Sequence, residues 1–155
     1  MGRLAGDQSA AGLEDGEEVT CIFCRIIAGD VPANVVLDDD VCLAFLDTKP
    51  LFFGHVLVVP KKHVVTLPEL PADQVAPLFA RVQLLSAAVP AAMEAEGSFV
   101  AMNNIVSQSV PHLHVHVVPR KKGDGLKGFF WPRRKYENDA QAADVAGKIR
   151  ARVDR

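Results

Sequence analysis

Short runs of alternating apolar and polar residues recur along the chain, a pattern typical of β-strands that bury one face. The runs stop at turn-forming residues such as Pro60 and the acidic stretch at residues 38–40. The pattern predicts strands at residues 35–37, 41–46, 55–59, 99–103 and 112–118, with the first two joined as a hairpin. Because these strands mostly follow one another without intervening helices, we expect an antiparallel sheet of about five strands in an α+β fold.

A different periodicity marks the helices. Between residues 73 and 94 apolar side chains recur every three or four positions, which predicts one long helix on the sheet, kinked or ended by Pro90. We also expect a short helical turn at residues 25–28 and a last helix at residues 140–152. Residues 1–18 have no periodic apolar face and are predicted to form a disordered tail.

Composition limits the kind of protein this is. With 155 residues, 49% hydrophobic residues and a formal net charge of −2, the chain suits one compact domain and not an obligate nucleic-acid partner. Apolar stretches such as residues 51–59 are too short to span a bilayer, and the N-terminus lacks the apolar core of a signal peptide. Three cysteines do not suggest a secreted disulfide framework, so we expect a cytoplasmic protein with no membrane association.

The stretch VPHLHVHVVP contains three of the five histidines of the chain. His112, His114 and His116 alternate with apolar residues, so on a strand they share one face. Neighbours two positions apart lie about 6.6–7 Å from each other along a strand, so the rings form a row that can line a site. The three rings are too far apart to hold one metal ion unaided.

The heptad HLHVHVV at residues 112–118 resembles the signature of the histidine triad (HIT) superfamily of nucleotide hydrolases and transferases. The blocks CIFCRIIAGDVPANVVLDDDVCLAFLD, GHVLVVPKKH and SQSVPHLHVHVVPR also resemble successive blocks of the branch with an N-terminal Cys-x-x-Cys. An isolated HxHxH is more often a metal-binding or solvated strand face; the ordered set is specific. The resemblance implies a HIT domain at residues 19–136, followed by a helical extension at 137–155, and a homodimer.

The resemblance assigns catalytic roles. It implies that His114 attacks an α-phosphate and forms a nucleotidyl-histidine, that His116 contacts the nucleophile and the phosphate, and that His55 completes the phosphate side. His55 has the alternative role of a strand-edge imidazole bonded to the backbone. Ser109 is expected to donate a hydrogen bond to the phosphate or the leaving group, although a serine before a strand is also ordinary turn chemistry.

Substrate-binding residues follow from the same resemblance. Asp47 is expected to bind ribose hydroxyls, with a strand-end turn as the alternative. Asn103 matches an active-site Asn of the family, with Asn104 as the alternative, and Gln108 is expected to contact phosphate. The loop between Asn103 and Gln108 is about two residues shorter than in the family and has no glycine. Fewer contacts between its backbone and the phosphate are therefore expected. An apolar clamp on the base is expected from Ile22, Phe23, Ile26 and Phe45, which would also be buried in an ordinary core.

Cys21 and Cys24 form half of a structural zinc site, which needs two further ligands. In the Cys-x-x-Cys branch the positions of His63 and His112 complete a Cys2His2 site, so the resemblance implies one structural Zn²⁺. The alternatives are a redox pair or two reduced, buried thiols. Cys42 is predicted to be a core residue.

Residues 119–136 carry seven Lys or Arg residues among Phe129, Phe130, Trp131 and Tyr136. This segment either holds phosphates and stacks a base, or packs its aromatic residues on the core or a partner subunit while its charges stay solvated. Trp131-Pro132 is similar to a Trp-Pro that some family members place beside the partner's active site.

The expected function is cleavage at the α-phosphate of a purine nucleotide conjugate, such as an AMP or GMP conjugate, or of a dinucleoside polyphosphate. The nucleotidyl group passes to water in a hydrolase, or to another acceptor, such as phosphate in a phosphorylase. The alternative is a catalytically weak nucleotide-binding adaptor that uses the basic, aromatic C-terminal segment to engage a partner.

Overall fold

The computed structural model describes residues 20–126 and 133–153. The chain divides into two compact units, Met1–Lys122 and Gly123–Arg155. The tail predicted at residues 1–18 and the Trp131-Pro132 pair lie outside the described residues. The domain boundaries predicted at residues 18 and 136 remain predictions.

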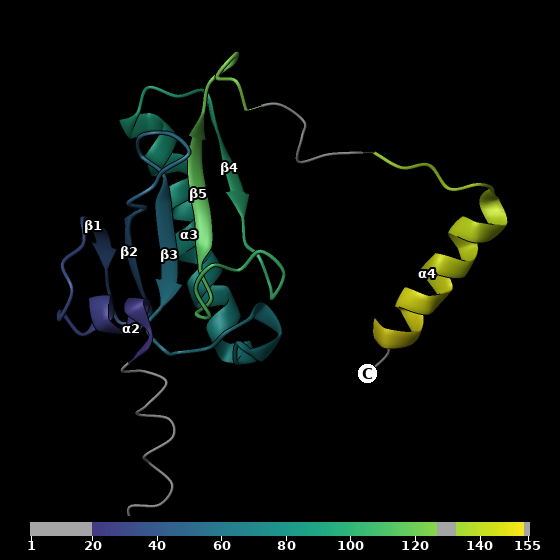
Figure 1. The fold of residues 1–155 in the computed structure, drawn as a ribbon, viewed down its shortest axis with the longest axis horizontal. Helices are drawn as coiled ribbons and strands as arrows, with labels where there is room; N and C mark the ends of the chain where they lie inside the picture. The colour runs from purple at the N-terminus through teal and green to yellow at the C-terminus, as the bar shows by residue number, and fades with distance from the viewer. Residues whose placement is uncertain (1–19, 127–132, 154–155) are drawn as a thin grey trace, which may run out of the picture. The chain divides into compact units, whose positions relative to one another are not determined.

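The first unit contains a five-stranded antiparallel sheet with the strand order β1-β2-β3-β5-β4 (Figure 1). This sheet confirms the α+β prediction, since the strands pair with neighbours of opposite direction. The strands are β1 Val35–Asp38, β2 Cys42–Leu46, β3 Val56–Pro60, β4 Gly97–Ala101 and β5 Val115–Arg120.

Three α-helices and one 3-10 turn accompany the sheet in the described part of the chain: α2 Ile22–Ile27, η1 Leu67–Glu69, α3 Ala72–Ala92 and α4 Asp139–Val153. Helix α2 begins before the predicted turn because the Cys21 sulfur caps it, accepting a hydrogen bond from the Cys24 amide at 3.4 Å. Helix α3 continues through Pro90 and ends at Ala92, so this proline lies inside the last turn of the helix.

Both faces of the central strands are buried. On one face, α3 packs against β3, β4 and β5 through Leu78, Val82, Leu85 and Val89. Figure 1 shows α3 running behind these strands. Cys42 belongs to this core, as predicted, and is fully buried. On the other face, Phe23 from α2 joins a second cluster with Phe45 from β2.

Helix α3 is the one described helix whose length and apolar composition would also suffice for a membrane span, which the sequence analysis did not anticipate. Its inward face is part of the sheet's core, and core helices of globular proteins have the same composition. Its outward face is also largely apolar, with Ala76, Ala80 and Leu84 exposed.

Strands β2 and β3 begin one residue later than predicted, and two other strands begin two or more residues away from the prediction. Strand β4 starts at Gly97, two residues early, because Gly97 pairs with Arg120. Strand β5 starts at Val115 and not at residue 112, because the chain before it bonds elsewhere: the Leu113 amide donates to the Val64 carbonyl at 2.8 Å. Of the three alternating histidines, only His116 lies inside a regular strand.

Candidate active site and metal centre

The histidines of the predicted phosphate site meet at the junction of β3 and β5. His116 lies opposite Leu57 in the β3–β5 register, and His55 comes directly before β3. Nε2 of His55 is 2.9 Å from Nδ1 of His116. The ring centroid of His116 is 5.0 Å from that of His114. The structure therefore brings together the three imidazoles that the sequence assigned to catalysis.

A backbone amide sets the proton positions on two of these rings. The Leu51 amide donates to Nδ1 of His55 at 3.0 Å, so the proton of neutral His55 must be on Nε2. That N–H points at Nδ1 of His116, which then accepts, and the proton of His116 is left on Nε2. Nε2 of His116 is therefore a hydrogen-bond donor.

Burial keeps these two rings neutral. Desolvation lowers the pKa of His116 to about 4, assisted by the neighbouring His114 and His55 and opposed by Asp47. Burial also lowers the pKa of His55, again opposed by Asp47. At neutral pH the pair therefore acts as a chain of neutral donors and acceptors.

His114 is held with its other nitrogen available. Its Nδ1 is 2.7 Å from the backbone carbonyl of His112, so Nδ1 carries the proton and donates to that oxygen. Nε2 then keeps its lone pair, which is the form of imidazole that can attack phosphorus. The ring is 3% exposed and packs edge-on against Phe23, with centroids 5.2 Å apart, so its orientation is fixed by packing.

Asp47 follows the end of β2 and forms the strand-end turn that was its alternative role, while its ribose-binding role stays a prediction. One carboxylate oxygen accepts from the Lys49 amide at 2.9 Å, which is a strand-end turn. The other oxygen is 3.7 Å from Nε2 of His55. The turn thus holds a carboxylate beside the histidines, where it can accept from two vicinal hydroxyls.

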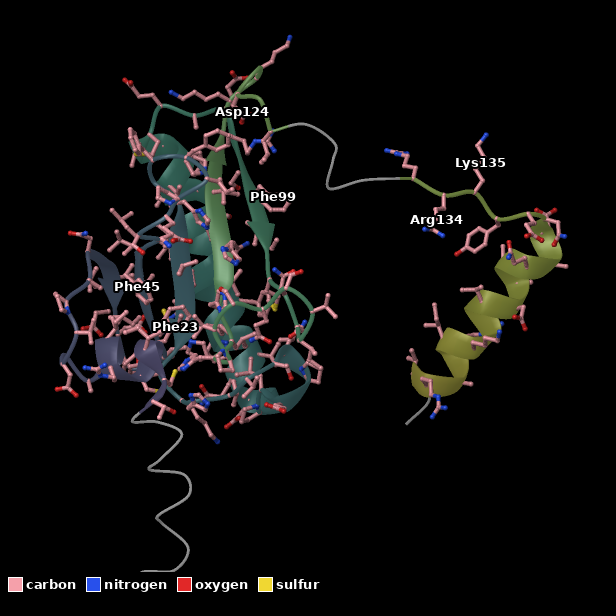
Figure 2. The ribbon with its side chains drawn as sticks, in the orientation of Figure 1. Phe23, Phe45, Phe99, Asp124, Arg134 and Lys135 are labelled. Carbon is pink, nitrogen blue, oxygen red and sulfur yellow. The ribbon has the colours of Figure 1, made fainter. Side chains whose placement is uncertain are left out.

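The four apolar residues predicted to clamp the base lie on α2 and β2. The rings of Phe23 and Phe45 meet edge-on with centroids 5.5 Å apart, and Figure 2 shows both on the α2 side of the sheet. Ile26 packs partly buried against the same cluster. Ile22 is 38% exposed, so it is the member of the set with most surface open to a ligand.

Three polar side chains of the 103–109 loop form hydrogen bonds within the loop and to residues 65 and 67. The amide group of Gln108 accepts from the Ile105 amide at 2.9 Å and donates to the Val65 carbonyl at 2.6 Å. Asn103 donates to the Ser107 carbonyl, whereas Asn104 accepts from the Leu67 amide. These bonds hold a loop in which two non-glycine residues, Ile105 and Ser107, have positive φ angles of 71° and 61°.

A cavity of about 360 Å³ opens beside the segment that precedes the triad. Its walls come from the N-terminal end of α2, the loop after β3 and the residues immediately before the triad, and comprise Thr20, Cys21, Ile22, His63, Val65, Ser109, Val110 and Pro111. Sequence reasoning gave no site role to four of these residues, Thr20, Val65, Val110 and Pro111. Val110 and Pro111 directly precede the triad in sequence, which was the only indication that they lie near the site.

The predicted metal ligands also come together. One ligand atom from each of Cys21, Cys24, His63 and His112 lies within 4.8 Å of the others. Nδ1 of His112 is 3.4 Å from the Cys21 sulfur and 3.2 Å from Nδ1 of His63, and the Cys24 sulfur is 3.2 Å from Nδ1 of His63. Tetrahedral zinc, with bonds of about 2.0–2.3 Å, separates its ligands by about 3.3–3.8 Å, so the four residues fit the ion.

The hydrogen bond on the far side of His112 supports the same conclusion. Its Nε2 is 2.9 Å from the Pro60 carbonyl and donates to it, which leaves the lone pair on Nδ1, inside the cluster. Burial lowers the pKa of His112 to about 4, so the ring is neutral and able to bind a metal.

The family model and the relatives that match the chain agree with each other. Residues 28–123 match the family model described as the HIT domain. The chain is 41% identical over 108 residues to adenylylsulfatase HINT3 of Arabidopsis thaliana, covering 68% of this chain and 55% of that protein, so it spans little more than half of this relative. It is 34% identical over 116 residues to adenosine 5'-monophosphoramidase hnt1 of Schizosaccharomyces pombe, covering 74% of this chain and 84% of that protein.

Solved structures resemble the fold over most of the chain. SMU.412c from Streptococcus mutans matches with a TM-score of 0.79 and 35% identity, covering 96% of this chain and 92% of that one. A zinc-bound histidine triad family protein from Mycobacterium smegmatis matches with a TM-score of 0.67 and 35% identity, covering 86% and 99%.

Proposed function

Because the chain belongs to the HIT domain family, we propose that it is a nucleotide hydrolase that cleaves its substrate at the α-phosphate through a covalent bond to His114. The observation that carries the proposal is the hydrogen bond from Nδ1 of His114 to the His112 carbonyl, which leaves the Nε2 lone pair free. The hydrolase names of two relatives support the same chemistry.

The proposed reaction proceeds in two steps. In the first step Nε2 of His114 forms a bond to the α-phosphorus, the bond from phosphorus to the leaving atom breaks, and the leaving atom keeps the electron pair and takes a proton. In the second step a water oxygen bonds to phosphorus, the P–N bond breaks with its electrons returning to Nε2, and the water releases the proton that the first step consumed. The product is a nucleoside monophosphate.

Neighbouring donors stabilise the charge that develops. The proton on Nε2 of His116 is available to a phosphate oxygen, because Nδ1 of that ring is occupied as an acceptor from His55. The Ser109 hydroxyl borders the triad segment and is our candidate donor to the leaving atom. Asn103 and Gln108 act as loop-positioning residues, since their amide groups bond within the loop and to Val65.

The rest of the nucleotide is proposed to lie along the α2 side of the sheet. Asp47 accepts hydrogen bonds from the ribose hydroxyls, because its carboxylate lies 3.7 Å from His55 at the start of the phosphate site. Ile22, Phe23, Ile26 and Phe45 provide an apolar surface for the base, which we expect to be a purine. Flat aromatic bases gain from apolar contact without requiring a polar partner for each edge.

We also propose that Cys21, Cys24, His63 and His112 hold one structural zinc ion. Four protein ligands would close the tetrahedron and leave no position for substrate, so the ion would serve folding and not catalysis. The resemblance to a zinc-bound family member supports this proposal.

A His114→Asn variant tests the catalytic proposal. Asn can still donate to the His112 carbonyl but has no nucleophilic nitrogen, so AMP release from adenosine 5'-phosphoramidate should fall by at least about a thousandfold with the unfolding midpoint unchanged. Quenching the wild-type reaction at alkaline pH should trap a nucleotidyl group on His114, because phosphoramidate bonds are labile in acid. Activity in the variant equal to wild type would refute the role.

The same assay separates the alternatives. If inorganic phosphate in the buffer is converted into nucleoside diphosphate, the acceptor is phosphate and the protein is a phosphorylase. Tight binding of AMP with no cleavage of any adenylated substrate would favour the nucleotide-binding adaptor. Light scattering at assay concentration checks the expected homodimer, for which β4, an edge strand with Val100 41% exposed, is available as a pairing surface.

A further inference from the structure

The two cysteines at the N-terminal end of α2 are close enough to bond to each other. Cys21 and Cys24 are both free thiols, and their sulfurs lie 3.4 and 3.5 Å from one atom, Nδ1 of His112. The two sulfurs are within 4.8 Å of each other. Because both side chains converge on one point and their residues are three apart in sequence, they can form a disulfide with movement confined to this turn of the chain.

The 360 Å³ cavity gives small solutes access to this pair. Cys21 and His63, two members of the metal cluster, line the cavity, and Cys24 is half-buried. The other walls are uncharged side chains, namely Thr20, Ile22, Val65, Ser109, Val110 and Pro111. A water molecule occupies about 30 Å³, so a molecule with two oxygen atoms, such as hydrogen peroxide, fits the cavity and reaches the cluster in the folded protein.

The third cysteine is protected from the same reagent. Cys42 is fully buried in the core under α3 and does not line the cavity. Burial raises the pKa of Cys42 to about 11, so almost none of it is the thiolate, which is the form that attacks an oxidant. Oxidation is therefore expected at Cys21 and Cys24 and not at Cys42.

A bond between the two sulfurs would move a residue that packs against the proposed nucleophile. Phe23 lies between the two cysteines, and its ring meets those of His112 and His114 edge-on, with centroids 5.9 and 5.2 Å apart. Two sulfurs on one tetrahedral zinc ion are about 3.8 Å apart, whereas bonded sulfurs are about 2.05 Å apart. Disulfide formation therefore brings the sulfurs closer by about 1.7 Å and shifts Phe23 against His114.

We propose that Cys21 and Cys24 are a site of reversible oxidation, at which a hydroperoxide converts the two thiols into a disulfide, removes two ligands from the metal site and slows the reaction at His114. The effects on the metal and on the reaction rest on the proposed function, whereas the oxidation itself does not.

The oxidation takes place in two steps. One thiolate sulfur attacks a peroxide oxygen, the O–O bond breaks, and a sulfenic acid and one water molecule form. The second sulfur then displaces the hydroxyl group as a second water molecule and forms the S–S bond. The two cysteines give up two electrons and two protons, hydrogen peroxide is reduced, and a dithiol such as dithiothreitol reverses the change.

The test titrates the full-length, zinc-containing protein with hydrogen peroxide. The intact mass should fall by two hydrogen atoms, and peptide mapping should find Cys21 bonded to Cys24 and Cys42 still free. A chromogenic chelator should detect one zinc ion released for each disulfide formed. Because a displacement of about 1 Å near reacting groups can cost roughly a hundredfold in rate, kcat for AMP release from adenosine 5'-phosphoramidate should fall by at least about tenfold. Dithiothreitol with added zinc should restore both zinc content and activity.

Two variants and a chelator are the controls. Cys42→Ala removes the thiol outside the pair and should respond to peroxide as the wild type does. Cys24→His supplies another zinc ligand without a second sulfur, so peroxide should neither lower its mass nor its activity. Removing zinc from the wild type with a chelator leaves the sulfurs unbonded, so activity at the assay temperature should persist; this control also covers the case in which Cys24→His does not fold.

The outcomes separate this inference from the proposed function. Zinc-containing protein whose mass is unchanged by peroxide overturns the inference and leaves the metal and hydrolase proposals standing, and so does a disulfide that forms without loss of activity. A disulfide in protein that never contained zinc supports the oxidation site and overturns the metal proposal. Failure of the untreated protein to cleave the phosphoramidate counts against the hydrolase proposal, while the mass still tests the disulfide.

Discussion

Gly54, directly before His55, is a position at which one methyl group should have a large effect. Its φ angle is +94°, in the left-handed region, where a residue with a Cβ atom is less stable by about 1–2 kcal/mol. An added Cβ would lie 2.5 Å from Cγ and 3.1 Å from Sδ of Met93, and 3.4 Å from Cγ of Pro119. Met93 has to leave its rotamer, at about 0.5–1.5 kcal/mol. Gly54→Ala should therefore lower the free energy of unfolding by about 2–3 kcal/mol.

Urea denaturation followed by circular dichroism measures this loss, and the melting temperature should fall by about 10 °C. Gly29→Ala is the matched control, because Gly29 has a similar φ of +83° but no atom within 4 Å of the added Cβ. It should cost only the backbone part, about 1 kcal/mol. In a Gly54→Ala/Met93→Ala double variant the contact disappears, so the two changes should be less than additive. A Gly54→Ala protein as stable as the Gly29→Ala protein would refute the reasoning.

Three further predictions concern the site. Protein purified without chelator should contain about one equivalent of zinc. Both chelation and Cys24→Ser should lower the melting temperature before activity is lost, because metal binding contributes to folding. Metal-free protein of unchanged stability would contradict the zinc proposal. Because the pKa of His116 falls from 6.5 in the unfolded state to about 4 in the folded state, the unfolded state binds the proton first; the contribution of His116 to stability is therefore complete above pH 6.5 and drops by about 1–2 kcal/mol at pH 5. His116→Asn should reduce the fall in the urea midpoint between about pH 7.5 and pH 5 by this share, while His112 and His55, whose pKa values are also lowered by burial, keep the rest. Leu51→Pro removes the amide that fixes the His55 tautomer and should lower kcat about fivefold or more, whereas Leu51→Ala keeps the amide and should not.

Much of the fold was predictable because its elements have strong periodicity. The helix over residues 73–94 and the strands around Leu43 and Val58 are defined by apolar spacing alone, and the structure contains them with ends shifted by one or two residues. The start of β5 was not predictable, because alternation continues through His112 and Leu113 while their backbone bonds go to a turn and to the loop after β3. Long-range backbone pairing has no signal in local sequence.

The site was predictable in its residue types and less so in its contacts. The resemblance of the histidine and cysteine motifs to the HIT family implied both clusters, and the structure brings each cluster together. The uses of Gln108 and Asn104 depend on where the 64–67 loop lies, which no residue pattern indicates. The Leu51 amide is invisible to sequence reasoning for the same reason, since any non-proline residue would supply it.

His112 has two separate duties that matter for protein engineering. Its side chain lies in the Cys2His2 cluster, while its backbone carbonyl oxygen accepts a hydrogen bond from Nδ1 of His114. A redesign that removes the metal by filling the cluster with apolar residues can replace the imidazole, but it must preserve the path of the backbone at this position. Variant libraries selected for metal independence should therefore be screened for turnover as well as stability, because a small rotation of one peptide plane would release the ring of His114, the proposed nucleophile, while the domain stays folded.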